Sequence, residues 1–227
     1  MKWKLWPLML CTSLGALAGG KGPGDAGDFR PDPRPLATTL VYDCDGFEFV
    51  TRLGPGEMAL WLPDGRYSVL SQVRSASGTK YQEGDTIFWS KGEAAMLQLG
   101  DVEYVDCRIQ PERAPWADAR RRGVAFRAVG NEPGWHLEIV PGRQLLYVGD
   151  YGAQRLVVPD PGERVEGTVH RYHAVTESTE LWVEIDTAGA CFDTMSGEAF
   201  PARVTLTVDG RSLSGCGRYL DTPPLTP

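Results

Sequence analysis

Short apolar runs separated by glycine and proline restrict the fold of this chain more than any other feature. Beyond residue 18 these runs rarely exceed five residues, and the 227-residue chain holds 27 glycines and 17 prolines. Such a pattern favours many short strands joined by turns over long helices. We therefore predict an all-β fold, and 42% hydrophobic residues are enough to build one or two packed cores.

Residues 1–18 have the pattern of a secretory signal peptide. Lys2 and Lys4 form a basic head, residues 5–14 an apolar run, and residues 16–18 a small-residue cleavage site. No later stretch approaches the roughly 20 apolar residues that a transmembrane helix needs. We expect an exported protein, periplasmic or secreted.

Cys11 offers an alternative ending for the leader. It follows Leu8-Met9-Leu10, which weakly resembles a lipoprotein signal, and lipidation of Cys11 would give an outer-membrane-anchored lipoprotein. The bulky Leu10 and the short leader fit that signal poorly, so we favour cleavage without lipid.

The charge balance bears on partners. Subtracting the two leader lysines from 23 basic residues leaves 21 against 30 acidic ones, a net charge near −9. We therefore expect no nucleic-acid partner and favour a basic protein. No motif predicts a cofactor or a metal, and none predicts an oligomeric state.

Four cysteines remain beyond the leader, an even number in an exported chain. Three pairings are possible, and we predict the local one, in which Cys44 with Cys107 and Cys191 with Cys216 each bracket one run of strands. The entropy of loop closure makes each bond worth roughly 3 to 4 kcal/mol.

The chain divides into segments of different character. Residues 19–37 read as a flexible tether rich in glycine and proline, 38–108 as a first β-domain, 109–123 as a linker, 124–220 as a second all-β domain, and 221–227 as a tail. In the first domain seven strands are predicted, at 40–42, 47–50, 58–62, 67–70, 86–89, 94–97 and 102–105. That spacing is typical of a small barrel or sandwich.

Three consecutive arginines, at 120–122, end the linker. We interpret them as an exposed interdomain segment with a short helical turn. The alternative is a basic contact for anionic envelope polymers or lipid headgroups.

Two small polar segments, at 75–81 and 89–92, interrupt the predicted strands and are expected to be loops at one rim. Around them lie Tyr42-x-Cys44, an Asp64-Gly65 turn, Ser77-Gly78-x-x-Tyr81, Trp89-x-Lys91-Gly92 and Tyr104-x-x-Cys107. This set resembles the MliC/PliC family, membrane-bound or periplasmic inhibitors of c-type lysozyme, over residues 42–107.

The resemblance implies an eight-stranded antiparallel barrel, closed by a disulfide between Cys44 and Cys107, whose loops enter the lysozyme cleft. It places the family's serine at Ser77 and its inserting lysine at Lys91. Gly78 and Gly92 would let the loops turn tightly. Tyr81 and Trp89 would brace them from the barrel side.

The second domain resembles a bacterial envelope domain without an established activity, through residues 130–135, 191–197, 200–201 and 215–216. We predict a second antiparallel, barrel-like unit. Glu132 and Asp193 could form a glycosidase-like carboxylate pair, but we interpret them as turn supports. His170 and His173 would lie on opposite faces of a strand, which disfavours a shared metal site.

The function predicted from these patterns is a non-enzymatic inhibitor of c-type lysozyme. The alternatives are a lipocalin-like barrel that binds a small apolar ligand within a cavity lined by Trp and Phe, and a structural envelope protein.

Overall fold

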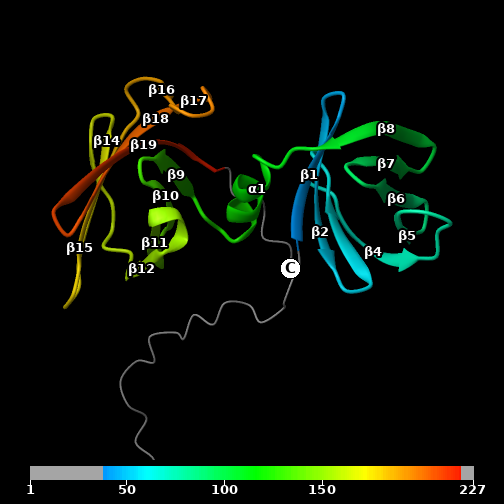
Figure 1. The fold of residues 1–227 in the computed structure, drawn as a ribbon, viewed down its shortest axis with the longest axis horizontal. Coiled ribbons are helices and arrows are strands. Elements are labelled where there is room, and N and C mark those ends of the chain that lie inside the picture. The colour runs from blue at the N-terminus through cyan, green and yellow to red at the C-terminus, as the bar shows by residue number, and fades with distance from the viewer. Residues whose placement is uncertain (1–37, 221–227) are drawn as a thin grey trace, which may run out of the picture. The chain divides into compact units, whose positions relative to one another are not determined.

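The structure, a computed structural model, describes residues 38–220 (Figure 1). The predicted signal peptide, the tether at 19–37, Cys11 and the tail at 221–227 lie outside the described residues.

The first part of the described chain is a closed antiparallel barrel of eight strands (Figure 1). Its strands are β1 (Thr38–Cys44), β2 (Phe47–Gly54), β3 (Glu57–Trp61), β4 (Tyr67–Val73), β5 (Thr79–Glu83), β6 (Thr86–Lys91), β7 (Ala94–Leu99) and β8 (Val102–Ile109). Each strand pairs with the next, and β8 returns to β1 through the pairs Tyr42 to Ile109 and Asp43 to Arg108. The strand β5 was missed by the sequence analysis, which assigned its first half to a loop.

The barrel interior is filled by large apolar side chains. Tyr42, Phe49, Met58, Leu70 and Phe88 are each at most 2% exposed and belong to one core cluster. Tyr42 stacks on Phe49 with ring centroids 5.4 Å apart. Since these side chains occupy the centre, the barrel core is packed in the way of a small barrel and not built around a lipocalin-like cavity.

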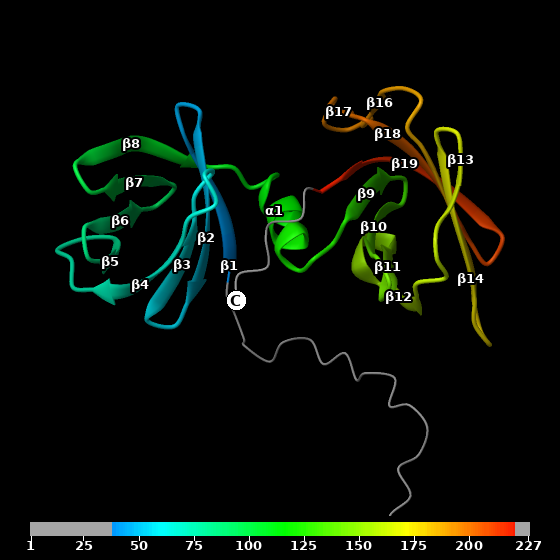
Figure 2. The ribbon, with the colours of Figure 1, turned by 180° about the vertical axis from the view of Figure 1, so that it is seen from behind.

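The second part is a nine-stranded antiparallel sheet that curls into a half-barrel. In spatial order its strands are β12 (Gln154–Pro159), β11 (Gln144–Gly149), β10 (Gly134–Val140), β9 (Phe126–Asn131), β19 (Arg211–Tyr219), β18 (Ala202–Val208), β15 (Glu180–Asp186), β14 (Val169–Val175) and β13 (Arg164–Glu166). Figure 2 shows β12 beside β11 and β13 beside β14, the two edges of the sheet. The unit is therefore barrel-like, as predicted, and stays open at its edges.

Three short elements accompany this sheet. They are the 3₁₀ turn η1 (Asp150–Gly152) and the strands β16 (Cys191–Phe192) and β17 (Ala199–Phe200), which form a separate two-stranded hairpin. The concave side of the sheet buries an apolar core that includes Phe126, Leu137, Leu145 and Val183. The strands β13, β16 and β17 have only two or three residues and were not predicted.

Each of the two parts contains one disulfide. One joins Cys44 at the end of β1 to Cys107 on β8, and the other joins Cys191 on β16 to Cys216 on β19. Both are the pairings expected from the sequence. The second one ties the small hairpin to the large sheet.

The helix α1 (Ala114–Arg121) occupies the predicted linker, and the run of arginines ends it. Arg122 donates to both carboxylate oxygens of Glu138, at 2.7 and 2.9 Å, and Arg127 donates to the same carboxylate. Glu138 is only 2% exposed. Arg122 is thus engaged in an internal ion pair, which removes it from the basic surface considered above.

Burial acts to raise the pKa of Glu138, but hydrogen bonds from Arg122 and the charges of both arginines outweigh burial and hold this pKa below its ordinary value.

We expect Glu138→Gln to lower the free energy of unfolding by about 2 kcal/mol, because a buried guanidinium loses its counter-charge. Glu184→Gln is the matched control. Glu184 accepts from Arg171 at 2.9 Å, but both side chains are exposed, and such pairs contribute less than about 1 kcal/mol. Equal losses in denaturant unfolding of the two variants would contradict the prediction.

Candidate functional site

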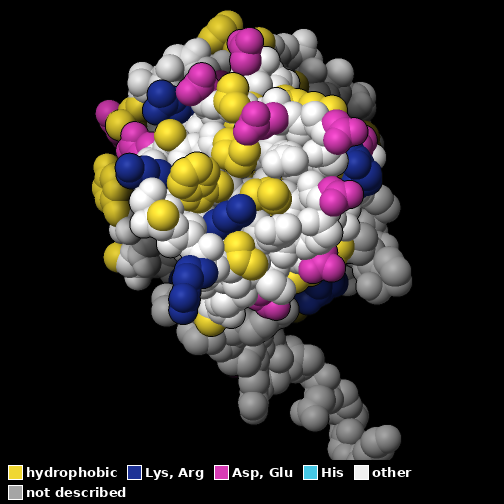
Figure 3. All heavy atoms as spheres, turned by 90° about the vertical axis from the view of Figure 1, so that its right-hand side faces the viewer, with side chains coloured by type: hydrophobic (Ala, Val, Ile, Leu, Met, Phe, Trp, Pro, Cys, Tyr) yellow, Lys and Arg dark blue, Asp and Glu magenta, His cyan; other side chains and the backbone are white. Residues whose placement is uncertain are grey.

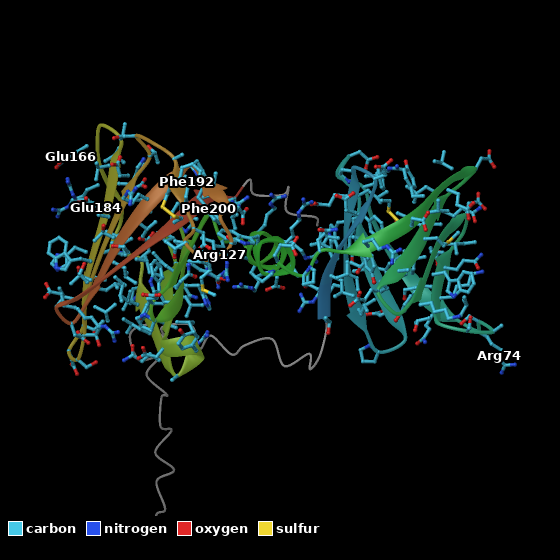
Figure 4. The ribbon with its side chains drawn as sticks, turned by 45° about the horizontal axis from the view of Figure 1, so that its top comes forward. Arg74, Arg127, Glu166, Glu184, Phe192 and Phe200 are labelled. Carbon is cyan, nitrogen blue, oxygen red and sulfur yellow. A yellow bond between two sulfur atoms is a disulfide. The ribbon has the colours of Figure 1, made fainter. Side chains whose placement is uncertain are left out.

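Two connections of the barrel meet at one rim. Because β4, β5 and β6 are antiparallel neighbours, β4 and β6 run in the same direction and end at the same rim. The loop 74–78 follows β4, and the turn at Gly92 and Glu93 follows β6. Figure 4 shows Arg74 projecting outward from this rim. The two polar segments identified in the sequence are therefore neighbours in space.

Only parts of these segments are loop. Residues 79–81 belong to β5 and residues 89–91 to β6, so the expectation that both segments are wholly loops was wrong. The pairing of Thr79 with Ser90 brings Gly78 next to Lys91. The strands themselves thus carry the candidate residues to the rim.

Ser77 is exposed at the tip of the first loop, and the loop around it is braced. The indole Nε1 of Trp89 donates to the carbonyl oxygen of Ser77 at 2.8 Å. The Ser75 hydroxyl donates to the carbonyl oxygen of Gly78 at 2.9 Å. These bonds occupy backbone acceptors and leave the Ser77 hydroxyl outside the brace.

Lys91 is exposed at the last position of β6. Within residues 38–220 no ion pair of Lys91 with a carboxylate is formed at salt-bridge distance. A primary ammonium at this position offers three hydrogen-bond donors and a positive charge to a partner.

Tyr81 and Trp89 have different roles, although both were expected to brace the loops from the barrel side. Tyr81 is 5% exposed in the barrel core, and burial raises the pKa of its phenol. Trp89 is 40% exposed and braces the loop from outside through its hydrogen bond to Ser77. Strand alternation explains the difference, because Trp89 follows the fully buried Phe88 and so points outward.

The charge around the rim is uneven. Residues 39–108 hold 11 acidic and six basic residues. Figure 3 views the barrel from the side of β5 to β8. Hydrophobic side chains and several Lys or Arg side chains lie at the centre and left of this face, and most acidic side chains lie along its border, where a few Lys or Arg side chains also lie. A cationic partner would thus meet an acidic border around a few central cations.

Gly78 and Gly92 share a left-handed backbone, with φ of 67° and 66°, but their surroundings differ. A Cβ at Gly78 would overlap the carbonyl oxygen of Ser90 and lie 3.2 Å from Nε1 of Trp89, whereas a Cβ at Gly92 would meet no atom within 4 Å. Gly78 is therefore required for the close approach of the 74–78 loop to β6, and Gly92 only for the backbone conformation of its turn.

This contrast gives a matched pair of variants. We expect Gly92→Ala to lower the free energy of unfolding by about 1 kcal/mol, which is the penalty of a left-handed non-glycine residue. Gly78→Ala is expected to lower it by about 2 to 3 kcal/mol, because the overlap with Ser90 must also be relieved. Denaturant unfolding measures both, and equal losses would contradict the close approach.

In the second sheet, Asp193 supports a turn. One of its oxygens accepts from the backbone N–H of Met195 and Ser196 at 3.1 and 2.7 Å, and the other accepts from Asn131 at 2.7 Å. His170 bonds Glu163, whereas His173 bonds Glu180. Among the described residues no group of three or more His, Cys, Asp or Glu side chains is arranged to hold a metal ion.

The fold and the rim together define a small, disulfide-closed β-barrel that presents two neighbouring connections at one end, of which the 74–78 loop is braced. The profile of a family described as membrane-bound lysozyme-inhibitor of c-type lysozyme, MliC, matches residues 42–106. The chain belongs to this family, whose members are described as inhibitors.

Two relatives carry the name membrane-bound lysozyme inhibitor of C-type lysozyme. The one from Yersinia enterocolitica is 35% identical over 78 residues, which are 34% of this chain and 67% of that protein. The one from Escherichia coli strain K12 is 35% identical over 78 residues, 33% of this chain and 72% of that protein. No solved structure matches the chain. No helix in the part of the chain that the structure describes is long and apolar enough to cross a membrane.

Proposed function

We propose that this protein inhibits c-type lysozyme by inserting the 74–78 loop and the Lys91 turn into the active-site cleft of the enzyme. The observation that carries the proposal is that an exposed serine in a braced loop and an exposed lysine at the end of β6 lie side by side at one rim. The family described as lysozyme inhibitors matches residues 42–106, which lie in the barrel that presents this rim.

The chemistry of the cleft favours this pair of side chains. A lysozyme active site presents two carboxyl groups, one protonated and one ionised, on either side of the sugar bond. The Lys91 ammonium would neutralise the ionised carboxylate and donate to it. The Ser77 hydroxyl can donate to one carboxyl group and accept from the other. Together they would fill the place of the substrate.

The bracing of the loop supports tight binding. A loop that is already held in its binding conformation loses less conformational entropy when it meets its partner. The bond from Trp89 to Ser77 and the tight approach of Gly78 to Ser90 hold the 74–78 loop against β6, which ends at Lys91, before any partner arrives. The acidic excess of the barrel would speed the encounter with a cationic enzyme more than it tightens the complex.

We propose an extracytoplasmic location, either periplasmic or secreted. Attachment to the outer membrane through a lipid on Cys11 is the alternative, in keeping with relatives that are named membrane-bound. Mass spectrometry of the N-terminus of the exported protein distinguishes a lipidated Cys11 from cleavage after Ala18.

The proposal is tested by titrating the purified protein against c-type lysozyme on a cell-wall substrate. Inhibition should be complete near one equivalent, and a saturating N-acetylglucosamine trimer, which occupies the cleft, should compete with the inhibitor. A phage-type lysozyme of different cleft shape is the control and should stay active. Lysozyme that keeps full activity at a large excess of this protein would refute the proposal, and inhibition without competition by the trimer would refute cleft insertion alone.

A further inference from the structure

The convex face of the second sheet presents a single exposed indole beside rows of hydroxyl groups. On β14, β15, β18 and β19 the side chains alternate between the buried core and this outer face. Two rows cross the outer face through paired positions: His173, Trp182, Thr207 and Ser212 form one, and Arg171, Glu184, Thr205 and Ser214 form the other. The face thus combines one aromatic platform with four short hydroxyl side chains.

Trp182 is 44% exposed and held in a fixed orientation. Its ring stacks on His173 with centroids 3.5 Å apart and an interplanar angle of 10°. The carboxylate of Glu180 accepts from Nε1 of Trp182 at 3.0 Å and bonds Nε2 of His173 at 2.9 Å. Because β15 lies between β14 and β18, the ring face not covered by His173 is turned toward β18.

The surface beside that free ring face is formed by short polar side chains. Thr205 and Thr207 on β18 and Ser212 and Ser214 on β19 are the outward residues there, and all four are exposed or half-buried. Each hydroxyl can donate one hydrogen bond and accept others. A ligand lying over β18 could therefore stack on the indole and exchange hydrogen bonds with the hydroxyl groups at the same time.

The one arginine of these two rows is already paired with carboxylates. Arg171 donates to Glu184 at 2.9 Å and to Glu166 at 2.5 Å, and these three side chains form one ion-pair cluster. Figure 4 shows Glu166 and Glu184 on the outer side of the sheet, away from Arg127. Because Arg171 is already paired and the two rows hold no other arginine or lysine, they present no cationic cluster of the kind that an anionic polymer needs. Arg203, exposed on β18, lies outside these rows.

We propose that this outer face binds an uncharged, extended polysaccharide. The C–H bonds on the flat face of a pyranose carry a weak positive charge and pack on the negative face of an indole. The sugar hydroxyls fit the donors and acceptors of the two hydroxyl rows, and an open strand surface suits a chain better than an enclosed small molecule. A protein partner would be expected to use a larger apolar patch than one indole surrounded by hydroxyls. The proposal does not depend on lysozyme inhibition.

Calorimetric titration of the full-length protein with a β-1,4-linked N-acetylglucosamine hexamer and with cellohexaose tests the proposal. At least one hexamer should bind, and binding should be unchanged between 50 and 500 mM NaCl, about one order of magnitude in ionic strength. Trp182→Ala should weaken binding by at least tenfold, Trp182→Tyr by only a few-fold, and Thr207→Val, which keeps the shape of the side chain, by about threefold. Tyr151→Ala, at an aromatic residue 83% exposed on η1, is the control and should bind as the unmodified protein does.

The melting temperatures of all variants are measured alongside, and Trp182→Tyr decides the matter if Trp182→Ala does not fold. The proposal is overturned if neither hexamer binds. It is also overturned if both Trp182 variants bind the hexamers with the affinity of the unmodified protein. Salt-sensitive binding of heparin in preference to the hexamers would show that the face serves an anionic polymer and also overturn it. The proposal would also be overturned if sedimentation showed that the protein self-associates and that Trp182→Tyr abolishes this association, since the face would then be an interface between copies.

Discussion

Lys91→Ala is expected to raise the dissociation constant for c-type lysozyme at least tenfold while leaving the melting temperature almost unchanged. Truncating one partner of a desolvated charge pair typically costs about 2 to 5 kcal/mol, largely because the other charge is left unpaired. That range corresponds to a loss of affinity of roughly 30-fold to several thousand-fold. The free energy of unfolding should hardly change, because Lys91 is exposed at the end of a strand and surface substitutions shift stability little.

Two further variants separate charge from shape. Lys91→Met keeps most of the aliphatic stem and removes the ammonium, so it should lose nearly as much affinity as Lys91→Ala if the charge carries the interaction. Arg66→Ala is the matched control, because Arg66 is an exposed cation paired with Asp64 in the connection that follows β3, at the opposite rim. Calorimetry that finds unchanged affinity in both Lys91 variants would refute the plug mechanism, even if the protein inhibits.

Ser77→Ala should weaken binding less than the lysine variants, because it removes a neutral hydroxyl and no charge. If Ser77 and Lys91 address the same pair of carboxyl groups, the losses should not add in the double variant, and the coupling should exceed about 0.5 kcal/mol. Additive losses would assign the two side chains to separate contacts.

Alternation and turn residues were sufficient to predict the short strands of a barrel or sandwich, and the cysteine positions to predict both disulfides, whereas the closed eight-stranded barrel followed from the family resemblance. The sequence was insufficient at β5, where Thr79, Lys80 and Tyr81 read as part of a polar loop. Their strand conformation depends on pairing with β4 and β6, and the three residues themselves do not form an alternating apolar pattern that would predict this pairing. Gly78 shows the same limit, since only the fold brings Ser90 against it.

In and around the second sheet, very short strands and the partner of an arginine could not be predicted from the sequence. The strands β16 and β17 have two residues each, and a disulfide ties their hairpin to β19. The run of arginines at 120–122 looked like a surface feature, but Arg122 pairs with Glu138, a residue 16 positions further along on β10. Its partner could not be assigned from the sequence, because an apolar strand with a single Glu does not reveal which cation faces it.

Removal of the barrel disulfide by Cys44→Ala with Cys107→Ala is expected to lower the free energy of unfolding of the barrel by about 4 kcal/mol. The bond spans 63 positions of sequence, and a longer loop loses more entropy on closure. For a domain of this size the loss corresponds to a fall in melting temperature of roughly 15 to 30 °C. Differential scanning calorimetry measures it.

The position of this bond explains why the barrel should depend on it. The seam between β1 and β8 is held by two residue pairs, whereas β1 and β2 share seven, so the disulfide secures the shortest ladder of the closed barrel.

The matched control is Cys191→Ala with Cys216→Ala. That bond spans 25 positions and is worth roughly 3 to 4 kcal/mol to the second sheet, and its removal should leave lysozyme inhibition unchanged. A barrel variant that melts and inhibits like the unmodified protein would show that the two-pair seam closes without the bond. Loss of inhibition in the control would show instead that the second sheet contributes to the interface with lysozyme.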